Sequence, residues 1–404
     1  MHIPIIEVSP GYKKTPDANF LLIKEMNGDI ICAVFELFKK NSILIISGIL
    51  AVVSCFIVHP DQEYIGYINF RVLAILMSLM LVVAMLLRIG TFDFRTDGLL
   101  RKLQTSRSIA MLLTVLSFLM AMFLTNDVTL VTLVPFAIAV MKGFNDRKGL
   151  MFTLILMTVA ANLGSMLTPI GNPQNLYLYT NYQMELIPFI KLMLPYSALS
   201  LVLTLLAVFI LCGNRKSEGR TSTDAPAPNN MRLIICIGLF IICVLAVADI
   251  IKWYIMFIVV TAIVAVIDRK SFKYVGYALL LTFVFFFVLI GNIGRIPVVY
   301  DTLSKVVDMS PVLTAVLSSQ IISNVPAAML LSAFTANGEA LVIGTNLGGL
   351  GTLIASMASL ITYKFYNVMP KEKEPGKTPG YLLSFTVVNV IFLGVLLLFW
   401  KLIA

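Results

Sequence analysis

The sequence predicts an all-α membrane protein that crosses the bilayer several times. Of its 404 residues, 59% are hydrophobic and only 13% are charged, and the mean hydropathy is +0.94. Several uninterrupted apolar stretches approach the ~20 residues that a helix needs to cross ~30 Å of hydrocarbon. The alternating segments of about ten residues that mark a membrane β-barrel do not occur. We therefore expect a polytopic helical fold surrounded by membrane lipids.

Charge and composition exclude several other classes of protein. The net charge is +9. In a membrane protein, excess basic residues usually lie in cytoplasmic loops and set the topology, so we expect no nucleic-acid partner. The five cysteines form no C-x-x-C pair, and the two histidines, His2 and His59, lie outside the apolar segments. Nucleotide-binding loops, zinc-protease patterns and nucleophile elbows do not occur. We expect no enzyme activity, no cofactor and no metal beyond a coupling Na⁺.

Apolar stretches of helical length occupy most of the chain after residue 41. We expect spans at 42–58, 70–88, 108–142, 149–180, 187–212, 232–249, 253–268, 273–291, 310–336, 340–365 and 380–403. Segment 213–231 is charged, lacks an apolar period and is expected to be a cytoplasmic linker. Residues 1–41 are expected to form a cytoplasmic tail, in which 28–40 is either an interfacial helix or loose chain.

Polar residues interrupt two of these stretches in their middle. The first break is Thr125-Asn126-Asp127 and the second is Ser323-Asn324-Val325-Pro326. Each arm of the second pair has about a dozen residues, or ~18 Å of helix, which is too short to cross. The first pair is flanked by basic residues at both ends, and basic flanks are cytoplasmic. We therefore expect two re-entrant hairpins, with both ends of the first on the cytoplasmic side.

The remaining spans predict an inverted repeat. About nine crossings place the N-terminus inside and the C-terminus outside, with 24 of the 30 Lys and Arg on the cytoplasmic side. Residues 42–212 and 253–404 each contain a hairpin followed by an interrupted span. The single connecting helix, 232–252, makes the second unit run in the opposite direction. Such repeats are typical of secondary transporters, whose site lies near the midplane.

The span after each hairpin is itself interrupted. Residues 168–175 contain two prolines, and 344–352 contain four glycines, so both helices are expected to open there. The N–H groups of an opened helix attract anions, and its carbonyls can ligate sodium. The candidate substrate-binding residues are Thr125, Asn126, Asn172, Asn175, Ser323, Asn324, Thr345 and Asn346. The candidate ion-coupling residues are Asp127, Thr168, Gly171, Gly344, Gly348 and Thr352.

Asp127 is the clearest ionisable residue deep in the apolar sequence. Burial favours its neutral form, which suits a proton carrier, although its carboxylate could instead neutralise a bound Na⁺. A third interpretation is that it caps the second helix of the hairpin. We also expect Gly164 to serve close helix packing. Asn162 and Gln320 either line the pathway or bond a neighbouring helix, and Asp249 and Asp268 are expected to face water.

The motifs at 125–127, 171–175 and 323–326 resemble the Ion Transporter superfamily. Within it, the chain is similar to arsenite permeases, sodium/proton antiporters, citrate–metal symporters and divalent anion–sodium symporters. The resemblance implies an elevator-type carrier in the cell membrane, usually a homodimer, that moves a small carboxylate or inorganic oxyanion with Na⁺ or H⁺. The dicarboxylate symporters carry Ser-Asn-Thr at both tips, whereas Asn126-Asp127 looks more like the arsenite permease and antiporter branches. Arsenite or antimonite efflux and Na⁺/H⁺ antiport are therefore the alternatives.

Overall fold

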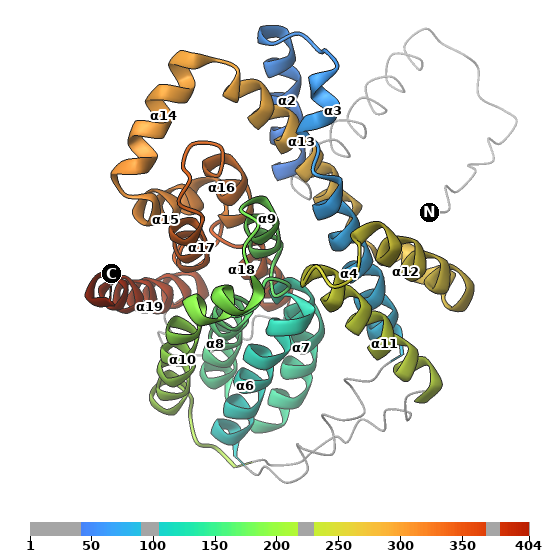
Figure 1. Ribbon diagram of the computed structural model, residues 1–404. Helices are drawn as coiled ribbons and strands as arrows, with labels where there is room; N and C mark the ends of the chain where they lie inside the picture. The colour runs from blue at the N-terminus through green and yellow to red at the C-terminus, as the bar shows by residue number, and fades with distance from the viewer. Residues whose placement is uncertain (1–41, 90–104, 217–229, 369–379, 404) are drawn as a thin grey trace, which may run out of the picture.

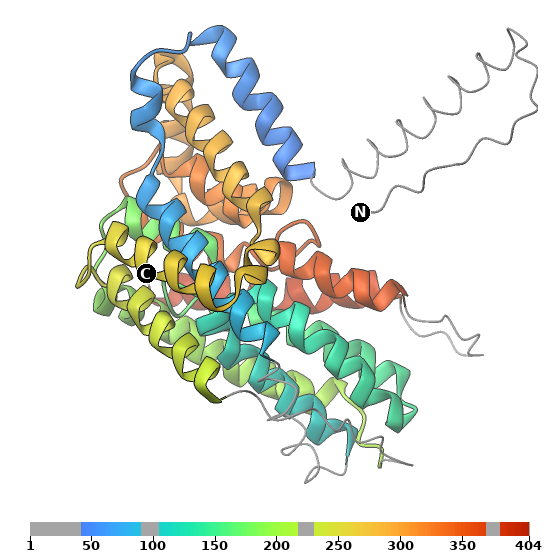
Figure 2. The same cartoon turned by 90° about the vertical axis from the view of Figure 1, so that its right-hand side faces the viewer.

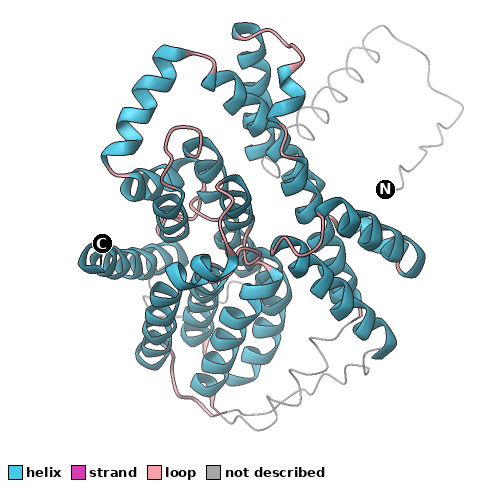
Figure 3. Ribbon diagram, viewed as in Figure 1, coloured by secondary structure: helices cyan, strands magenta, loops and turns pink. Residues whose placement is uncertain are grey.

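The computed structural model describes residues 42–89, 105–216, 230–368 and 380–403, and these consist of helices joined by loops (Figures 1 and 3). Seven of the described helices are long and apolar enough to cross a membrane. They are α4 (Phe70–Arg88), α6 (Ser106–Leu124), α8 (Arg147–Ser165), α10 (Leu186–Leu211), α11 (Asn230–Val247), α13 (Tyr277–Gly294) and α19 (Tyr381–Ile403). The prediction of a polytopic helical membrane protein is confirmed. The expected interfacial helix at 28–40 and most of linker 213–231 lie outside the described ranges.

The shorter helices complete the fold. They are α2 (Ser42–Ile57), α3 (Glu63–Tyr67), α7 (Asn126–Met141), α9 (Pro173–Asn181), α12 (Trp253–Ile267), α14 (Pro297–Met309), α15 (Pro311–Ile322), α16 (Asn324–Leu331), α17 (Gly338–Leu347) and α18 (Met357–Val368), with the 3₁₀ helices η1 (Lys142–Phe144) and η2 (Arg269–Tyr274). Most boundaries lie within a few residues of the predicted spans. Neither α3 nor α14 is among the predicted spans, because neither is long or apolar enough to cross.

One set of helices, which we call the scaffold group, consists of α2, α3, α4, α11, α12 and α13. Here α13 packs along α2, and α4 packs against α11 and α12 (Figures 1 and 2). Glycine allows two of these contacts. A Cβ on Gly48 would lie 3.0 Å from the ring of Phe285, and one on Gly291 would overlap the ring of Tyr67. The aromatic rings therefore fill the space that the missing side chains leave.

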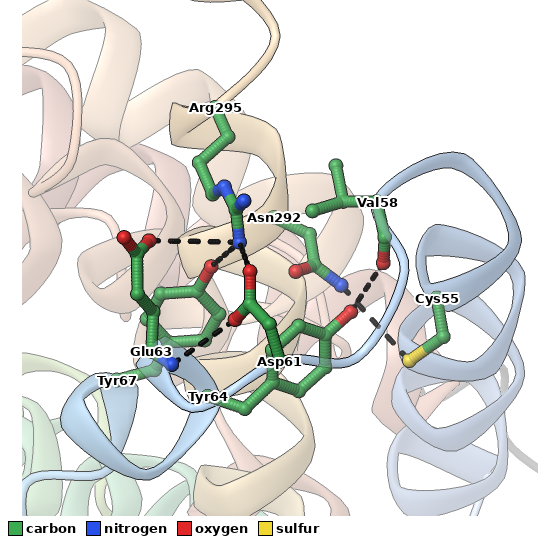
Figure 4. Close-up of polar contacts among 8 residues, drawn as sticks. All are labelled: Cys55, Val58, Asp61, Glu63, Tyr64, Tyr67, Asn292 and Arg295. Carbon is green, nitrogen blue, oxygen red and sulfur yellow. Dashed lines mark hydrogen bonds and ion pairs between the residues drawn. The ribbon is translucent and has the colours of Figure 1, made fainter.

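An ionic cluster fastens α3 to the end of α13 (Figure 4). An Arg295 Nη1 lies 2.7 Å from the Asp61 carboxylate, 3.1 Å from the Tyr67 hydroxyl and 3.5 Å from Glu63. Beneath it, the Asn292 amide donates to the Ser54 hydroxyl at 2.9 Å, which joins α13 to α2. This end of the scaffold group is therefore held by polar contacts from three helices.

Ion pairs join both ends of α4 to the segments that flank α12. Arg71 contacts Asp249 at 2.6 Å near the start of both helices, and Arg88 contacts Asp268 at 2.7 Å near their ends. The two helices therefore run parallel. Asp249 is exposed, as expected. The expectation that Asp268 faces water is wrong: it is 9% exposed, because Arg88 and the Ser271 hydroxyl both donate to its carboxylate.

A second set of helices, which we call the hairpin group, consists of α6 to α10 and α15 to α19. Its centre is α8, whose side chains are buried from Gly149 to Ser165. A Cβ on Gly164 would overlap the backbone of Phe118, so glycine lets α6 and α8 touch, as predicted. At the base, the Ser106 hydroxyl donates to Gly213 O at 2.8 Å and ties α6 to the end of α10.

The two groups meet where α9 contacts α4 and where α16 contacts α13. Aromatic rings fill part of this boundary: the ring of Tyr177 on α9 lies 6.2 Å from Phe283 and 6.0 Å from Phe287 on α13. The Tyr177 hydroxyl also bonds to Ser332, just after α16, at 2.7 Å. The boundary therefore combines apolar contact across the groups with polar contact within the hairpin group.

Candidate functional site

The two predicted helix breaks at the hairpin tips are present, and their backbones match. Between α6 and α7, Thr125 has φ 70° and ψ 152°, and between α15 and α16, Ser323 has φ 74° and ψ 154°. This region of backbone space is used almost only by glycine and costs another residue of order 1–3 kcal/mol. The same unfavourable conformation therefore occurs at the same place in both hairpins, held by the surrounding structure.

The two interrupted helices also open, at 166–172 between α8 and α9 and at 348–356 between α17 and α18. Pro173 is the first residue of α9, a position where proline is tolerated because the backbone N–H there would have no partner within the helix. The second opening starts later than the sequence suggested, because Gly344, Thr345 and Asn346 belong to α17. Gly344 accommodates the Val312 carbonyl of α15, and the Thr345 hydroxyl donates to its own helix.

Three buried asparagines join the two interrupted helices. The Asn172 amide donates to the Asn346 oxygen at 3.0 Å, and the Asn346 amide donates to the Asn175 oxygen at 2.6 Å. The Asn172 oxygen in turn accepts from the Asn175 backbone N–H at 2.9 Å, which caps α9. We call these residues the asparagine triangle. All three were predicted to bind substrate, and in the structure their amides bond to each other.

A second set of polar contacts joins the first hairpin tip to the other half of the chain. The Asn126 amide donates to the Asn162 oxygen at 2.9 Å, and that oxygen also accepts from the Ser356 hydroxyl at 3.0 Å. Asn162 therefore bonds neighbouring segments, one of the two interpretations that its sequence allowed. At the second tip, Asn324 is buried and its backbone N–H donates to Ala355 O at 3.0 Å.

A cavity of about 630 Å³ lies between the two groups of helices. Its walls come from α4, the first hairpin tip, the start of α9 and the segment between η2 and α13. Three predicted residues line it: Thr125, Asp127 and Asn172. The other predicted residues are not among its lining residues: Asn126, Asn175, Ser323, Asn324, Thr345, Asn346, Thr168, Gly171, Gly344, Gly348 and Thr352.

Asp127 lies in the first turn of α7, beside the cavity. Its backbone N–H donates a hydrogen bond to the Asn126 side-chain oxygen at 2.9 Å. Within the described residues its carboxyl group has no hydrogen-bond or ionic partner. The capping interpretation is therefore not what the structure shows, and the carboxyl group remains available to a proton, a cation or a solute.

Arg88 brings a positive charge to the cavity wall, but this charge is already neutralised. Its guanidinium forms the ion pair with Asp268 and lies 5.5 Å from the ring centre of Tyr274. Most of the remaining wall is aliphatic, including Leu76, Leu79 and Met80 on α4. Among the described residues, the cavity thus combines one unpaired carboxyl group, the hydroxyls of Thr125 and Tyr274, one amide and a large apolar surface.

Comparison with known proteins identifies the family. Residues 30–340 match the model of the citrate transporter family. The chain belongs to this family. It is 32% identical to an uncharacterized transporter of Methanocaldococcus jannaschii over 77% of this chain and 85% of that protein, and 30% identical to the inner membrane protein YbiR of Escherichia coli over 78% and 84%. A silicon efflux transporter of Oryza sativa is 28% identical over 45% of this chain and 36% of its own length.

Membership of this family confirms the predicted resemblance to the Ion Transporter superfamily and makes the chain a multi-pass membrane transporter. Two residues of the site were missed by sequence reasoning. Ser356 lies in a run of small residues that gives no signal, and Arg88 looks like an ordinary basic flank of a span. Gln320 was recognised as polar within an apolar arm, which was the available signal.

Proposed function

We propose that this family member is a secondary active transporter that moves a small anion, a carboxylate or an inorganic oxyanion, with Na⁺ or H⁺. The observation that carries the proposal is the cavity in which the start of α7, the start of α9 and the unpaired Asp127 carboxyl group come together. The family's description as citrate transporters favours a carboxylate. We infer that the protein lies in the cell membrane, with its N-terminus in the cytoplasm and its C-terminus outside.

Anion binding would rely on helix ends instead of a basic side chain. Thr125 and Asp127 bracket the first residue of α7, and Pro173 is the first residue of α9, so both helices begin at the cavity wall. A helix N-terminus carries roughly half a positive charge and unpaired N–H groups, which suit an oxyanion. The Thr125 hydroxyl would add a donor. Asp127 must lose its charge, to a proton or a cation, for an anion to enter the same cavity at low cost.

The arrangement of helices supports an elevator mechanism. The hairpin group carries Thr125, Asp127 and Asn172, whereas the scaffold group supplies the apolar wall on α4. The asparagine triangle and the Asn126–Asn162–Ser356 contacts tie both interrupted helices together, so the hairpin group would move as one body. The matching backbone at Thr125 and Ser323 supports an inverted repeat of 42–212 and 253–404. By the family resemblance, two copies would form a homodimer.

A second candidate function is efflux of an uncharged metalloid hydroxide such as arsenite or antimonite. Two observations favour it. The cavity wall is largely apolar and, among the described residues, offers no unpaired cationic side chain, and one relative is a silicon efflux transporter. Growth in arsenite would separate the two, because only the second candidate predicts that an expressing strain survives better than one without the gene. Na⁺/H⁺ antiport is the third possibility, which the following vesicle measurement distinguishes.

Uptake into proteoliposomes tests the proposal. Sodium and proton gradients are imposed separately while a panel of mono-, di- and tricarboxylates and inorganic oxyanions is offered to wild type and Asp127→Asn. We expect one gradient to drive one class of anion and Asp127→Asn to abolish accumulation. Asp308→Asn, an exposed aspartate on α14, is the matched control and should behave as wild type. Sodium–proton exchange without anion movement would contradict the proposal and favour antiport.

A further inference from the structure

The opening between α17 and α18 wraps around the side chain of Gln320 on α15. The Gln320 Nε2 lies 2.9 Å from Gly348 O, 2.9 Å from Leu350 O and 3.2 Å from Val316 O. Its Oε1 accepts from the Thr352 backbone N–H at 2.9 Å. This last bond fixes the orientation of the carboxamide, because only its nitrogen can then face the carbonyls. Three carbonyl oxygens therefore surround one amide nitrogen.

One glycine of this opening, Gly351, leaves room for that amide. Gly351 has φ +110°, a conformation that other residues rarely adopt, and a Cβ there would overlap the Gln320 oxygen. A Cβ on Gly348 would lie 2.7 Å from the hydroxyl of Ser319, the residue before Gln320. The glycines were expected to open the helix, and at Gly351 the group that approaches the backbone is a side chain of the protein.

The first interrupted helix contains the same arrangement. The Asn175 Nδ2 lies 3.1 Å from Thr168 O, 3.3 Å from Met166 O and 3.4 Å from Ser165 O. Its Oδ1 is fixed by the donation from Asn346. The amide comes from α9 here and from α15 in the other half, so the two halves reach the same result with residues from different elements. In both, an NH₂ group lies among the carbonyls that an opened helix exposes.

Clusters of carbonyl oxygens released by an opened helix are the sites at which transporters hold a sodium ion. An amide NH₂ group supplies two hydrogens, which the three carbonyl oxygens of such a cluster share, and it brings no net charge. A cation and the nitrogen cannot occupy the same position, because the nitrogen already lies at hydrogen-bond distance from each carbonyl oxygen. We propose that Gln320 and Asn175 fill these two clusters in place of sodium, so that the protein neither binds nor requires Na⁺.

This inference deepens the proposed function, on which its meaning for transport rests, because it leaves a proton on Asp127 as the coupling ion. It is nevertheless a statement about sodium binding, which is measured without a transported solute. Thermal unfolding of the purified full chain in lipid nanodiscs is recorded in NaCl, KCl and choline chloride at equal ionic strength, and ²²Na⁺ binding is measured on the same samples. The wild type is expected to melt at the same temperature in all three salts and to bind no ²²Na⁺.

Removal of the Gln320 amide should make the stability of the protein depend on sodium. Gln320→Ala exposes Gly348 O and Leu350 O, so we expect a lower melting temperature that Na⁺, but not K⁺ or choline, raises again. Gln320→Glu keeps the shape of the side chain and guards against a failure of the Ala variant to fold. Its carboxylate faces the same carbonyls, so it too should gain a saturable, sodium-specific stabilisation and ²²Na⁺ binding. Gln62→Ala, at an exposed position, is the matched control and should remain insensitive to sodium.

Saturable sodium-specific stabilisation of the wild type would overturn the inference, and so would Gln320 variants that fold but ignore sodium. Uptake in the proteoliposomes separates this failure from that of the proposed function. If a sodium gradient is needed for anion uptake, the inference is wrong and the transporter function stands. If no anion moves under any gradient while the binding results hold, the amide sites stand and the proposed substrate class is wrong.

Discussion

The asparagine triangle makes a prediction that can be worked from its geometry. Asn346 donates to Asn175 at 2.6 Å and to Val342 O at 2.7 Å, and accepts from Asn172 at 3.0 Å. Asn346→Ala leaves the Asn175 oxygen without its donor, whereas Asn172 keeps a bond to Ser165 at 3.2 Å. The substitution should therefore strand one buried oxygen outright and weaken one further contact.

The expected cost follows from two bounds. Side-chain hydrogen bonds between membrane helices average ~0.6 kcal/mol and reach ~1.7 kcal/mol, whereas a buried polar group left without a partner costs ~1–3 kcal/mol in water-soluble proteins. One stranded oxygen plus a lost interhelical bond thus predicts that Asn346→Ala lowers the free energy of unfolding by about 2–4 kcal/mol. Removal of the side chain also leaves a small cavity, and the cost of this cavity moves the expected value toward the upper end of this range.

A double-mutant cycle isolates the contact from the cavity. Asn175→Ala, Asn346→Ala and the double variant are unfolded reversibly in bicelles, and the coupling energy between the two positions is calculated. We expect about 1–2 kcal/mol of favourable coupling, because the distance is short and the site is buried. Ser54→Ala with Asn292→Ala, a polar contact of 2.9 Å inside the scaffold group, provides a comparison pair. Additive effects at 175 and 346, with coupling below ~0.3 kcal/mol, would refute the view that the triangle binds the two interrupted helices together.

Three further predictions concern other parts of the molecule. The hydrogen bond from Arg295 lowers the pKa of the Asp61 carboxyl group. The contribution of this group to stability is therefore present above the unfolded-state pKa of ~3.9 and is lost as the pH falls through the lower folded-state pKa. Asp61→Asn should remove this part of the acid dependence of the melting temperature. Gly164→Val should prevent folding, because the side chain would overlap the Phe118 backbone; a folded, monodisperse product in size-exclusion chromatography would contradict this. Thr125→Gly relieves a φ of 70° and should stabilise the protein by about 1 kcal/mol against chemical unfolding, after the entropy cost of glycine is subtracted; unchanged or lower stability would contradict the strain.

The helices and their interruptions were predictable because the signals are local. An apolar run of ~20 residues implies a span, Pro173 marks the start of a helix, and polar residues at 125–127 break one. The burial of Asp268 was not predictable, since its partner Arg88 lies far away in the sequence. Gly344 was assigned to an opening although it remains helical, because a glycine that admits the Val312 carbonyl looks the same in sequence as one that ends a helix.

The function of each amide could not be predicted for a related reason. Asn172, Asn175 and Asn346 were expected to bind a substrate, and in sequence an amide that faces a solute cannot be distinguished from one that faces another amide. Their proximity was implied by the repeat, but their closed pattern of donors and acceptors depends on distances near 3 Å between distant segments. Gln320 shows the limit most clearly, because its partners are main-chain carbonyls, which every residue has.

The ion pairs at the two ends of α4 have a consequence for the membrane itself. Arg71 and Arg88 are separated by 17 residues, which corresponds to about 26 Å along a helix. The ion pairs with Asp249 and Asp268 hold both ends of α4 to neighbouring segments. The apolar surface of α4 is therefore limited to the distance between these two pairs. A hydrocarbon core of ~30 Å would reach past this distance, and the lipid around α4 would have to thin by a few ångströms. The protein is thereby suited to a thin bilayer, and lipids with longer acyl chains would destabilise both ion pairs by drawing the ends of α4 into the hydrocarbon.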